Sequence, residues 1–487
     1  MRKRSIVYFF ALLIVYNSYG QQPDSAAGST VAFATPVLKK IQVPAWLSKP
    51  LLDRPLIDSS APAAPSEPFA WGDFTWMNGT DRQKSALLDS KYFTGSFTCD
   101  VNYTQSNHAP IDNTVVGSTA LARNGEFTVS FLGFGGDLHW NNVRGRFLTQ
   151  FGTRATVVPR NDFSQYRGQY DLATAYRYLS EAYGGYHFDV WHGINVDAGI
   201  FMSYVGLFSY NNFENWGYQP SFTSDNTPWF FNGLRIQTFP TDKLKVELWL
   251  INGWQSYAKF NKMPGVGFQV KYATKEWWNF VSNGYVGTDA AGLATRTRWH
   301  SDNSFLLRYY NNPQKKSGIT RAAFSVTGDL GVENGGGVTP FGGKQPDGTM
   351  YPAQNFISGM AYNRLWFGEH FAWTIGGGFM HNPGRYLVLA PTGDASPLPP
   401  VGTHPFSMNP GDKFDSWDCS TTLNFMPNDY ITWVFELVHR EANVPYFAGH
   451  GGVTSPDGYS TTPLTPGWAP DLVKTESRFV LAMIVHF

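Results

Sequence analysis

Residues 478–487, the last ten of the chain, read RFVLAMIVHF. Every second residue in this stretch is large and apolar, namely Phe479, Leu481, Met483, Val485 and Phe487. Side chains alternate between the two faces of a β-strand, so these five share one face. A soluble sandwich could bury such a stripe. A strand that closes a transmembrane barrel faces lipid along its length and can end at the membrane interface, where aromatic residues are enriched. The stretch therefore predicts the closing strand of a barrel, and we expect the five residues to form the signal that the barrel-assembly machinery reads.

The first residues predict export. Residues 1–4 are basic, residues 6–16 are apolar, and Ser18 and Gly20 place small side chains before a cut ahead of Gln21. This order is typical of a secretory signal peptide, so residues 1–20 are predicted to be removed. The apolar stretch is shorter than the roughly 20 residues of a spanning helix, and no later stretch is long enough. If the mature chain enters a membrane, it must cross it as strands.

The composition agrees with a barrel. Aromatic residues reach 16% and charged residues only 15%, whereas charged residues are near a quarter of a soluble domain. The formal net charge is zero, which gives no support for a nucleic-acid partner. The two cysteines, Cys99 and Cys419, exclude a disulfide scaffold. Both fall on the apolar faces of strands that are not predicted neighbours, so we expect free thiols facing lipid.

About sixteen strand-like runs follow Lys91, and long and short connections alternate between them. The runs lie near 92–105, 126–140, 143–157, 174–188, 193–205, 229–239, 243–254, 265–274, 277–288, 296–310, 319–332, 355–367, 371–381, 413–426, 430–440 and 475–487. Long extracellular loops and short periplasmic turns are typical of outer-membrane barrels. The predicted fold is all-β, a transmembrane antiparallel up-and-down β-barrel formed by residues 86–487.

The segment before the barrel is rich in Pro, Ala and Ser. We interpret residues 21–85 as a periplasmic tether or a small plug. Within it, residues 71–79 form an aromatic cluster that either tucks into the mouth of the barrel or anchors the chain at the membrane interface. Seven tryptophans toward strand ends or on the apolar faces are predicted to form interface girdles rather than a sugar-stacking slide: Trp249, Trp254, Trp277, Trp278, Trp366, Trp373 and Trp433.

A series of short motifs lies between residues 195 and 254. Residues 195–201 read NVDAGIF, a polar loop follows, and then come FNGLR at 231–235, TDKL at 241–244 and INGW at 251–254. The loop contains Asn211, Glu214, Asn215 and Ser221. This order resembles the OmpL-like β-barrel porin family; the Pro-rich start departs from the family pattern. The resemblance implies an outer-membrane channel of Gram-negative bacteria and implies neither a particular solute nor catalytic residues.

A sixteen-strand barrel is wide enough for an aqueous channel, so we expect passive diffusion of small hydrophilic solutes. Basic residues outnumber acidic ones on the polar faces of the runs, which predicts a mild anion preference unless the charges pair across the wall. The candidate pore-lining residues are Arg144, Arg146, Arg154, Arg235, Lys245, Glu247, Lys271, Arg308 and Arg440.

The alternative function is a substrate-specific transporter gated by a hatch, with the N-terminal segment as its plug. An enzyme is not expected, because no Ser or His of the chain sits in a nucleophile motif such as G-x-S-x-G. No His, Cys or Asp cluster has metal-ligand spacing, so we expect no metal and no cofactor. The expected partners are outer-membrane lipid, the assembly machinery and small solutes; the sequence leaves the oligomeric state open.

Overall fold

The computed structural model describes residues 67–79, 82–83, 86–118, 121–162, 164, 168–208, 211–384, 386, 413–459 and 468–487. Residues 64–487 form one compact unit. The predicted signal peptide and residues 21–66 of the predicted tether lie outside the described residues.

The described part is almost entirely β-structure. The long strands are β2 (Phe93–Ser106), β3 (Phe127–Trp140), β4 (Val143–Thr149), β5 (Leu179–Phe188), β6 (Ile194–Met202), β7 (Phe230–Thr241), β8 (Leu244–Ile251), β9 (Gly265–Tyr272), β10 (Trp278–Gly287), β11 (Thr297–Asn311), β12 (Arg321–Asn334), β15 (Asn355–Phe367), β16 (Phe371–Pro383), β17 (Lys413–Asn428), β18 (Ile431–Ala442) and β21 (Thr475–His486). The two-residue strands are β1 (Leu88–Asp89), β13 (Gly343–Lys344), β14 (Met350–Tyr351), β19 (Phe447–Ala448) and β20 (Leu472–Val473).

The helices are short and lie in the connections. They are η1 (Thr75–Met77), α3 (Arg154–Val157), η2 (Val158–Asn161), α4 (Leu172–Tyr176), η4 (Asn212–Glu214) and α5 (Phe222–Asp225). In the described part of the chain, no helix has both the length and the apolar character needed to cross a membrane.

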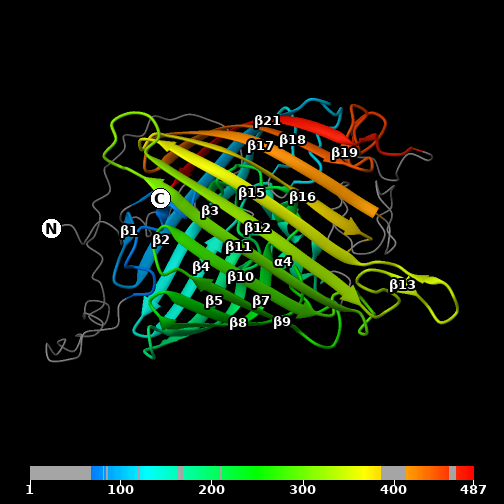
Figure 1. Ribbon diagram of the computed structural model, residues 1–487, viewed down its shortest axis with the longest axis horizontal. Helices are drawn as coiled ribbons and strands as arrows, with labels where there is room; N and C mark the ends of the chain where they lie inside the picture. Colours follow the sequence, from blue (N-terminus) through cyan, green and yellow to red (C-terminus); the bar gives the residue numbers. More distant parts are fainter. Residues whose placement is uncertain are drawn as a thin grey trace, which may run out of the picture. The chain divides into compact units, whose positions relative to one another are not determined.

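The sixteen long strands close into an antiparallel barrel (Figure 1). Each strand pairs with its neighbour in sequence, and the last strand, β21, pairs with both β18 and β2. At this seam Phe487 exchanges backbone hydrogen bonds with Phe97, and their rings stack with centroids 5.0 Å apart. The predicted fold class and the sixteen strands are confirmed.

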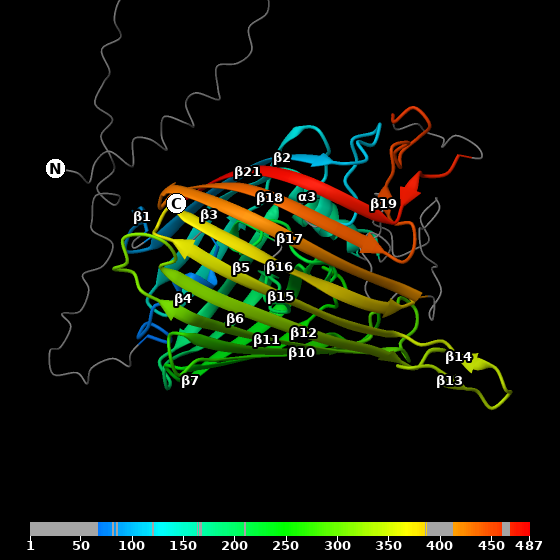
Figure 2. The ribbon, with the colours of Figure 1, turned by 45° about the horizontal axis from the view of Figure 1, so that its top comes forward.

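Short and long connections gather at opposite ends of the barrel, as Figures 1 and 2 show. One end carries the turns 141–142, 242–243, 368–370 and 429–430, together with the C-terminus. The other end carries loops such as 107–126, 335–354 and 443–474, which hold the β13–β14 and β19–β20 hairpins. We call these the short-turn end and the long-loop end. In bacterial barrels the short turns face the periplasm.

The faces of the strands alternate as the sequence predicts. In β21 the odd-numbered residues from Thr475 to Phe479 are exposed, and their even-numbered neighbours are buried. Leu481, Met483 and Val485 are half-buried on the same outer face. Both cysteines are free thiols; Cys419 is exposed and Cys99 half-buried.

Three sequence expectations are wrong in detail. The run 143–157 ends as a strand at Thr149, and Arg154 begins α3 instead of continuing β4. Gly152 adopts a φ of +101°, which turns the chain away from the sheet. The run 174–188 begins as a strand at Leu179, because residues 172–176 are helical. Of the seven predicted girdle tryptophans, Trp249, Trp254 and Trp366 are buried inside the barrel.

Candidate functional site: the interior of the barrel

Asp197 of β6 joins two arginines of the inner wall. Its carboxylate lies 2.7 Å from Arg235 Nη2 of β7 and 3.2 Å from Arg144 Nε of β4. The strand register explains the second contact. Asp197 pairs with Gly185 of β5, which in turn pairs with Arg144. A Cβ atom at Gly185 would lie 2.2 Å from Asp197 Oδ1, so only glycine lets Arg144 and Asp197 meet across β5.

Two more predicted pore-lining bases form ion pairs on the same side of the wall. Arg146 Nη1 lies 2.8 Å from Asp137 Oδ2, and its Nε also pairs with Glu181. Lys245 Nζ lies 2.7 Å from Glu247 Oε1.

Lys271 differs from these residues. It stands opposite Lys245 in the register of β8 and β9. No carboxylate of the described residues lies within 4.0 Å of its Nζ. Instead Nζ lies 5.0 Å from the centre of the Phe69 ring, a cation–π contact.

In several ion pairs the base is more accessible than the acid. Arg144 is 30% exposed and Asp197 0%; Lys245 is 18% exposed and Glu247 3%; Arg146 is 22% exposed and Glu181 10%. In these three pairs the acid lies behind the base. The Arg146–Asp137 pair is the opposite, because Asp137 is 51% exposed and Arg146 is 22% exposed.

The remaining predicted bases bind chain segments that lie inside the barrel. Arg440 Nη2 lies 2.7 Å from Asp225 Oδ2, and Arg308 Nη1 lies 3.0 Å from Asp73 Oδ2. Arg154 Nη2 donates a 3.0 Å hydrogen bond to Asn212 Oδ1. All three side chains are buried.

The connection between β6 and β7, residues 203–229, folds into the barrel. We call it the inner loop. Its described residues from 211 to 229 are buried, apart from the half-buried Glu214. A loop on the surface would be largely exposed, so the barrel wall itself covers this loop.

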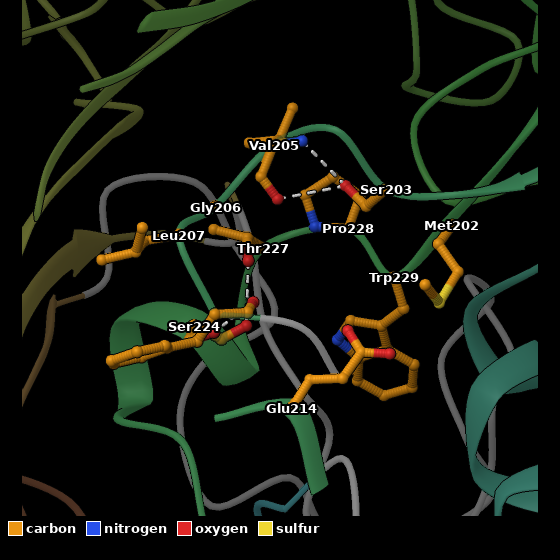
Figure 3. Close-up of a pocket in the computed structure, with 11 residues that line it drawn as sticks. Met202, Ser203, Val205, Gly206, Leu207, Glu214, Ser224, Thr227, Pro228 and Trp229 are labelled. Atoms are coloured by element: carbon orange, nitrogen blue, oxygen red, sulfur yellow. Dashed lines mark hydrogen bonds between the residues drawn. The ribbon is translucent and has the colours of Figure 1, made fainter. Parts of the chain in front are cut away.

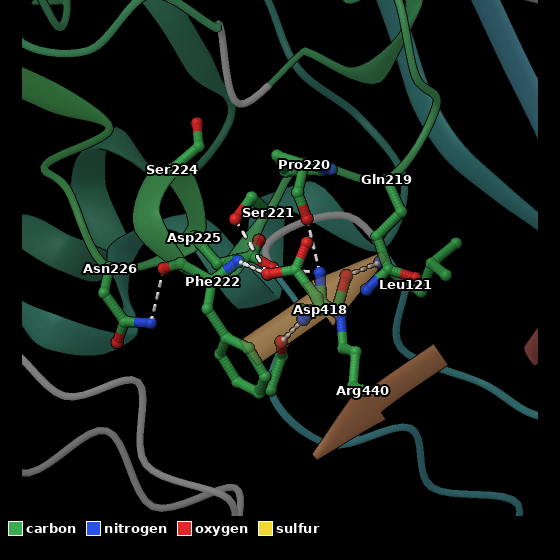
Figure 4. A network of polar contacts seen from close by, with 12 residues as sticks. Leu121, Gln219, Pro220, Ser221, Phe222, Ser224, Asp225, Asn226, Asp418 and Arg440 are labelled. Atoms are coloured by element: carbon green, nitrogen blue, oxygen red, sulfur yellow. Dashed lines mark hydrogen bonds and ion pairs between the residues drawn. The ribbon is translucent and has the colours of Figure 1, made fainter. Parts of the chain in front are cut away.

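Carboxylates and arginines of β15, β17 and β18 hold the inner loop in place, and Figure 4 shows Asp418 and Arg440 among them. Asp418 of β17 accepts hydrogen bonds from Ser221 Oγ (2.7 Å) and Phe222 N (2.8 Å). Arg440 of β18 binds Asp225 and the carbonyl oxygen of Pro220. These charge-assisted contacts hold the loop against β17 and β18.

Two further residues hold the tip of the loop. Glu436 of β18 accepts the backbone N–H groups of Tyr218 (2.6 Å) and Gln219 (2.8 Å). Arg364 of β15 donates a 2.9 Å hydrogen bond to the carbonyl oxygen of Trp216. The inner loop is therefore tied to several strands and narrows the interior between them.

A cavity of about 130 Å³ lies between the two ends of the inner loop (Figure 3). Among its lining residues are Met202, Glu214, Thr227 and Trp229. The Trp229 indole N–H is buried, and no hydrogen-bond partner is found for it among the described residues. The space is roomy enough for several water molecules.

A second segment occupies the short-turn end. The described residues of 67–83, which we call the mouth segment, run from one side of the barrel rim to the other. At one side Phe69 N donates a 2.8 Å hydrogen bond to the carbonyl oxygen of Asp242. At the other, Arg82 Nη2 binds the carbonyl oxygen of Asn428 (2.7 Å), and Gln83 Nε2 binds that of His486 (2.8 Å).

Between these points the mouth segment packs into the barrel. Trp76 is 1% exposed, and its Nε1 donates a 2.9 Å hydrogen bond to the carbonyl oxygen of Glu276. The rings of Trp76 and Trp216 lie 6.4 Å apart. Of the two readings of residues 71–79, tucking into the mouth is the one observed; the interface anchor is wrong.

The alternation of polar and apolar residues places Asp418 and Glu436 on the polar faces of their strands, and the structure agrees. Sequence reasoning missed Arg364, which lies on the polar face of β15. The alternation does not show which segments of the chain these three residues bind. Trp249 lies on the same face as Glu247, so the same signal argued against its place in a girdle. The described residues hold no cluster of His, Cys, Asp or Glu suited to a metal ion.

Comparison with known proteins adds a family. A model of the family "Putative beta-barrel porin-2, OmpL-like" matches residues 92–487. No curated protein matches the chain.

Solved structures with a similar trace include the outer membrane channel DcaP of Acinetobacter baumannii (10% identity, 82% of this chain and 96% of that chain, TM-score 0.43). A second is the anion-selective porin from Comamonas acidovorans (10% identity, 81% of this chain and 99% of that chain, TM-score 0.44). A third is the trimer form of OmpT of Vibrio cholerae (7% identity, 82% of this chain and 100% of that chain, TM-score 0.46). The family match spans the whole barrel and agrees with the closed sixteen-strand wall. This chain belongs to the OmpL-like β-barrel porin family, whose members are porin-like channels of the outer membrane.

Proposed function

We propose that this chain is a passive diffusion channel for small hydrophilic solutes, with no catalytic activity. The observation that carries the proposal is the inner wall: it bears ion pairs such as Arg144–Asp197 and Lys245–Glu247, where a filled barrel would bear apolar side chains. Charged groups on a barrel interior are stable where water reaches them. The inner loop and the mouth segment would set the width of the water path.

We further propose a mild preference for anions. Arg144 and Lys245 are each more exposed than the acid that they bind behind them. A solute in the lumen would therefore meet the positive partner first. The preference stays mild because each pair is neutral overall.

Liposome swelling tests the channel. Proteoliposomes of the refolded mature chain should swell in small sugars and amino acids, at rates that fall as solute size rises. Swelling no faster than that of protein-free liposomes, for every solute, would refute the channel. Reversal potentials in a potassium chloride gradient test the preference; a cation-selective potential would remove that part alone.

A second candidate function is a transporter gated by a hatch, and the position of the mouth segment favours it. The segment crosses the short-turn end and buries Trp76 inside the barrel. Deleting residues 67–79 distinguishes the two functions. A hatch requires that the full chain stays closed and conducts only after the deletion. A channel that the mouth segment merely narrows conducts in both forms, with moderately larger steps after the deletion.

A further inference from the structure

The mouth segment contacts four basic side chains of the barrel wall at the short-turn end. They are Lys243 in the β7–β8 turn, Lys271 of β9, Arg308 of β11 and Arg321 of β12. We call them the basic cluster. They come from the part of the wall between β7 and β12, and β10, which lies between β9 and β11, contributes none of them.

The mouth segment presents aromatic rings to the two lysines. Lys243 Nζ lies 5.5 Å from the centre of the Trp71 ring, and Lys271 Nζ lies 5.0 Å from that of Phe69. Neither lysine has a carboxylate of the described residues within 4.0 Å. The rings therefore stand where counter-ions would otherwise bind.

The mouth segment presents a carboxylate and another ring to the two arginines. Asp73 Oδ2 lies 3.0 Å from Arg308 Nη1 and 3.7 Å from Arg321 Nη2. The Arg308 guanidinium also lies 5.8 Å from the Trp76 ring. Arg308 has one further partner, Glu276, at 2.5 Å. The Asp73 carboxylate therefore lies between two arginines. Elsewhere along the mouth segment, aromatic rings cover the neighbouring basic groups.

Free space adjoins this arrangement. A cavity of about 220 Å³ lies beside the mouth segment, and its lining includes two bases, Arg82 and Arg321, and two acids, Glu369 and Asp429. A solute in this cavity would reach Arg321 with the mouth segment still in place. It could compete with Asp73 for that guanidinium.

We propose that the basic cluster is a binding site for aromatic carboxylates on the solute path, and that the mouth segment occupies it as a tethered stand-in for the solute. A carboxylate would take the place of Asp73 between Arg308 and Arg321. An aromatic ring would take the place of Phe69 or Trp71 over a lysine. The inference rests on the proposed channel and names a solute class for it.

The test uses benzoate as a blocker of chloride current in planar bilayers, with acetate and benzyl alcohol as the acid-only and ring-only probes. Deleting residues 67–79 should lower the half-blocking concentration of benzoate by about tenfold or more relative to the full chain. Benzoate should block at lower concentration than either control probe. Adding Lys271→Met to the deletion should weaken the block again. Lys316→Met, an exposed lysine of the β11–β12 turn, should not.

A substitution pair tests the same point in the full-length chain. The double variant Phe69→Ala, Asp73→Asn removes one covering ring and the carboxylate. Like the deletion, it should lower the half-blocking concentration of benzoate. Equal block of all forms, or block unaffected by Lys271→Met in the deletion, would overturn the binding site while leaving the channel intact. If neither the full chain nor the deletion conducts, the proposed channel fails first and the site with it.

Discussion

Trp216 Nε1 donates a 3.1 Å hydrogen bond to the carbonyl oxygen of Trp76. Trp216 belongs to a loop that starts at the long-loop end, and Trp76 belongs to the segment at the short-turn end. A second contact accompanies it, from Gly79 N to the carbonyl oxygen of Glu214 (2.9 Å). The inner loop and the mouth segment therefore meet inside the barrel, and the water path must pass beside their junction.

Weakening this junction should widen the path. We expect Trp216→Ala to raise single-channel conductance, because it removes both the indole hydrogen bond and a large buried ring. Trp373→Ala is the matched control, since Trp373 is exposed on the outer face. Unchanged conductance in a folded Trp216→Ala protein would show that the junction lies off the solute path.

The Arg440–Asp225 pair should dominate the stability of the inner loop. Arg440→Met breaks a buried ion pair by removing one of its two charges, which costs about 3–5 kcal/mol in comparable pairs. Arg123→Met breaks the exposed Arg123–Glu126 pair and should cost about 0–1 kcal/mol. Urea unfolding of the two variants in the same lipid vesicles gives the comparison; equal midpoints would contradict the anchoring role of Arg440.

Asp197 should tune ion selectivity. Asp197→Asn leaves Arg144 and Arg235 without their shared carboxylate, so we expect a stronger anion preference. Asp457→Asn in the long loop 443–474 is the control and should leave the reversal potential unchanged. The reversal potential of each variant is measured in a salt gradient. A shift toward cations in Asp197→Asn would contradict the proposed arrangement of bases in front of acids.

The mouth segment should loosen in acid. Burial raises the pKa of Asp73, but hydrogen bonds from Thr75 and the charges of Arg321 and Arg308 outweigh it and hold the pKa below the ordinary 3.8. A lowered pKa means that the carboxylate stabilises the segment fully above pH 3.8 and that this contribution is lost as the pH falls through the folded pKa.

Trp fluorescence and conductance between pH 6 and pH 2 check this. Asp73→Asn should lack the part of the acid transition that belongs to Asp73 and should resemble the acid form already at pH 6. Glu276→Gln is the necessary companion, because Glu276 also binds Arg308 and accepts the backbone N–H of Asp73. A transition that survives in Asp73→Asn and disappears in Glu276→Gln would transfer the role to Glu276.

The C-terminal residue should matter for assembly. Phe487→Ala removes the stacking on Phe97 at the seam between β2 and β21, so we expect less folded barrel in the outer membrane. Tyr459→Ala, an exposed aromatic residue of a long loop, is the control. Heat-modifiable mobility of membrane fractions reports the folded share. Equal shares in the two variants would argue against Phe487 as part of the assembly signal.

The strand pattern could be predicted from the sequence because it is a local property. Alternation such as that of Phe479, Leu481 and Met483 depends only on the period of two and on lipid outside the barrel. The charged inner-wall residues Arg144, Arg235, Lys245 and Lys271 followed from the same parity. Arg154 was misplaced, because the turn at Gly152 depends on a backbone conformation that parity does not show.

The partners of those charges could not be predicted, because they depend on contacts between distant segments. Arg440 meets Asp225 across 215 residues, and Arg308 meets Asp73 across 235. A single residue can also decide such a contact: Arg144 reaches Asp197 across β5 because Gly185 has no side chain. The paths of the inner loop and the mouth segment follow from such contacts and not from any repeating pattern.

Single-channel recording in planar bilayers, on the full mature chain and on the chain lacking residues 67–79, tests the central claim most directly. The expected result is discrete conductance steps from both proteins, with larger steps from the deletion. Folded protein that inserts into the bilayer and yields no steps in either form would contradict a water path through this barrel.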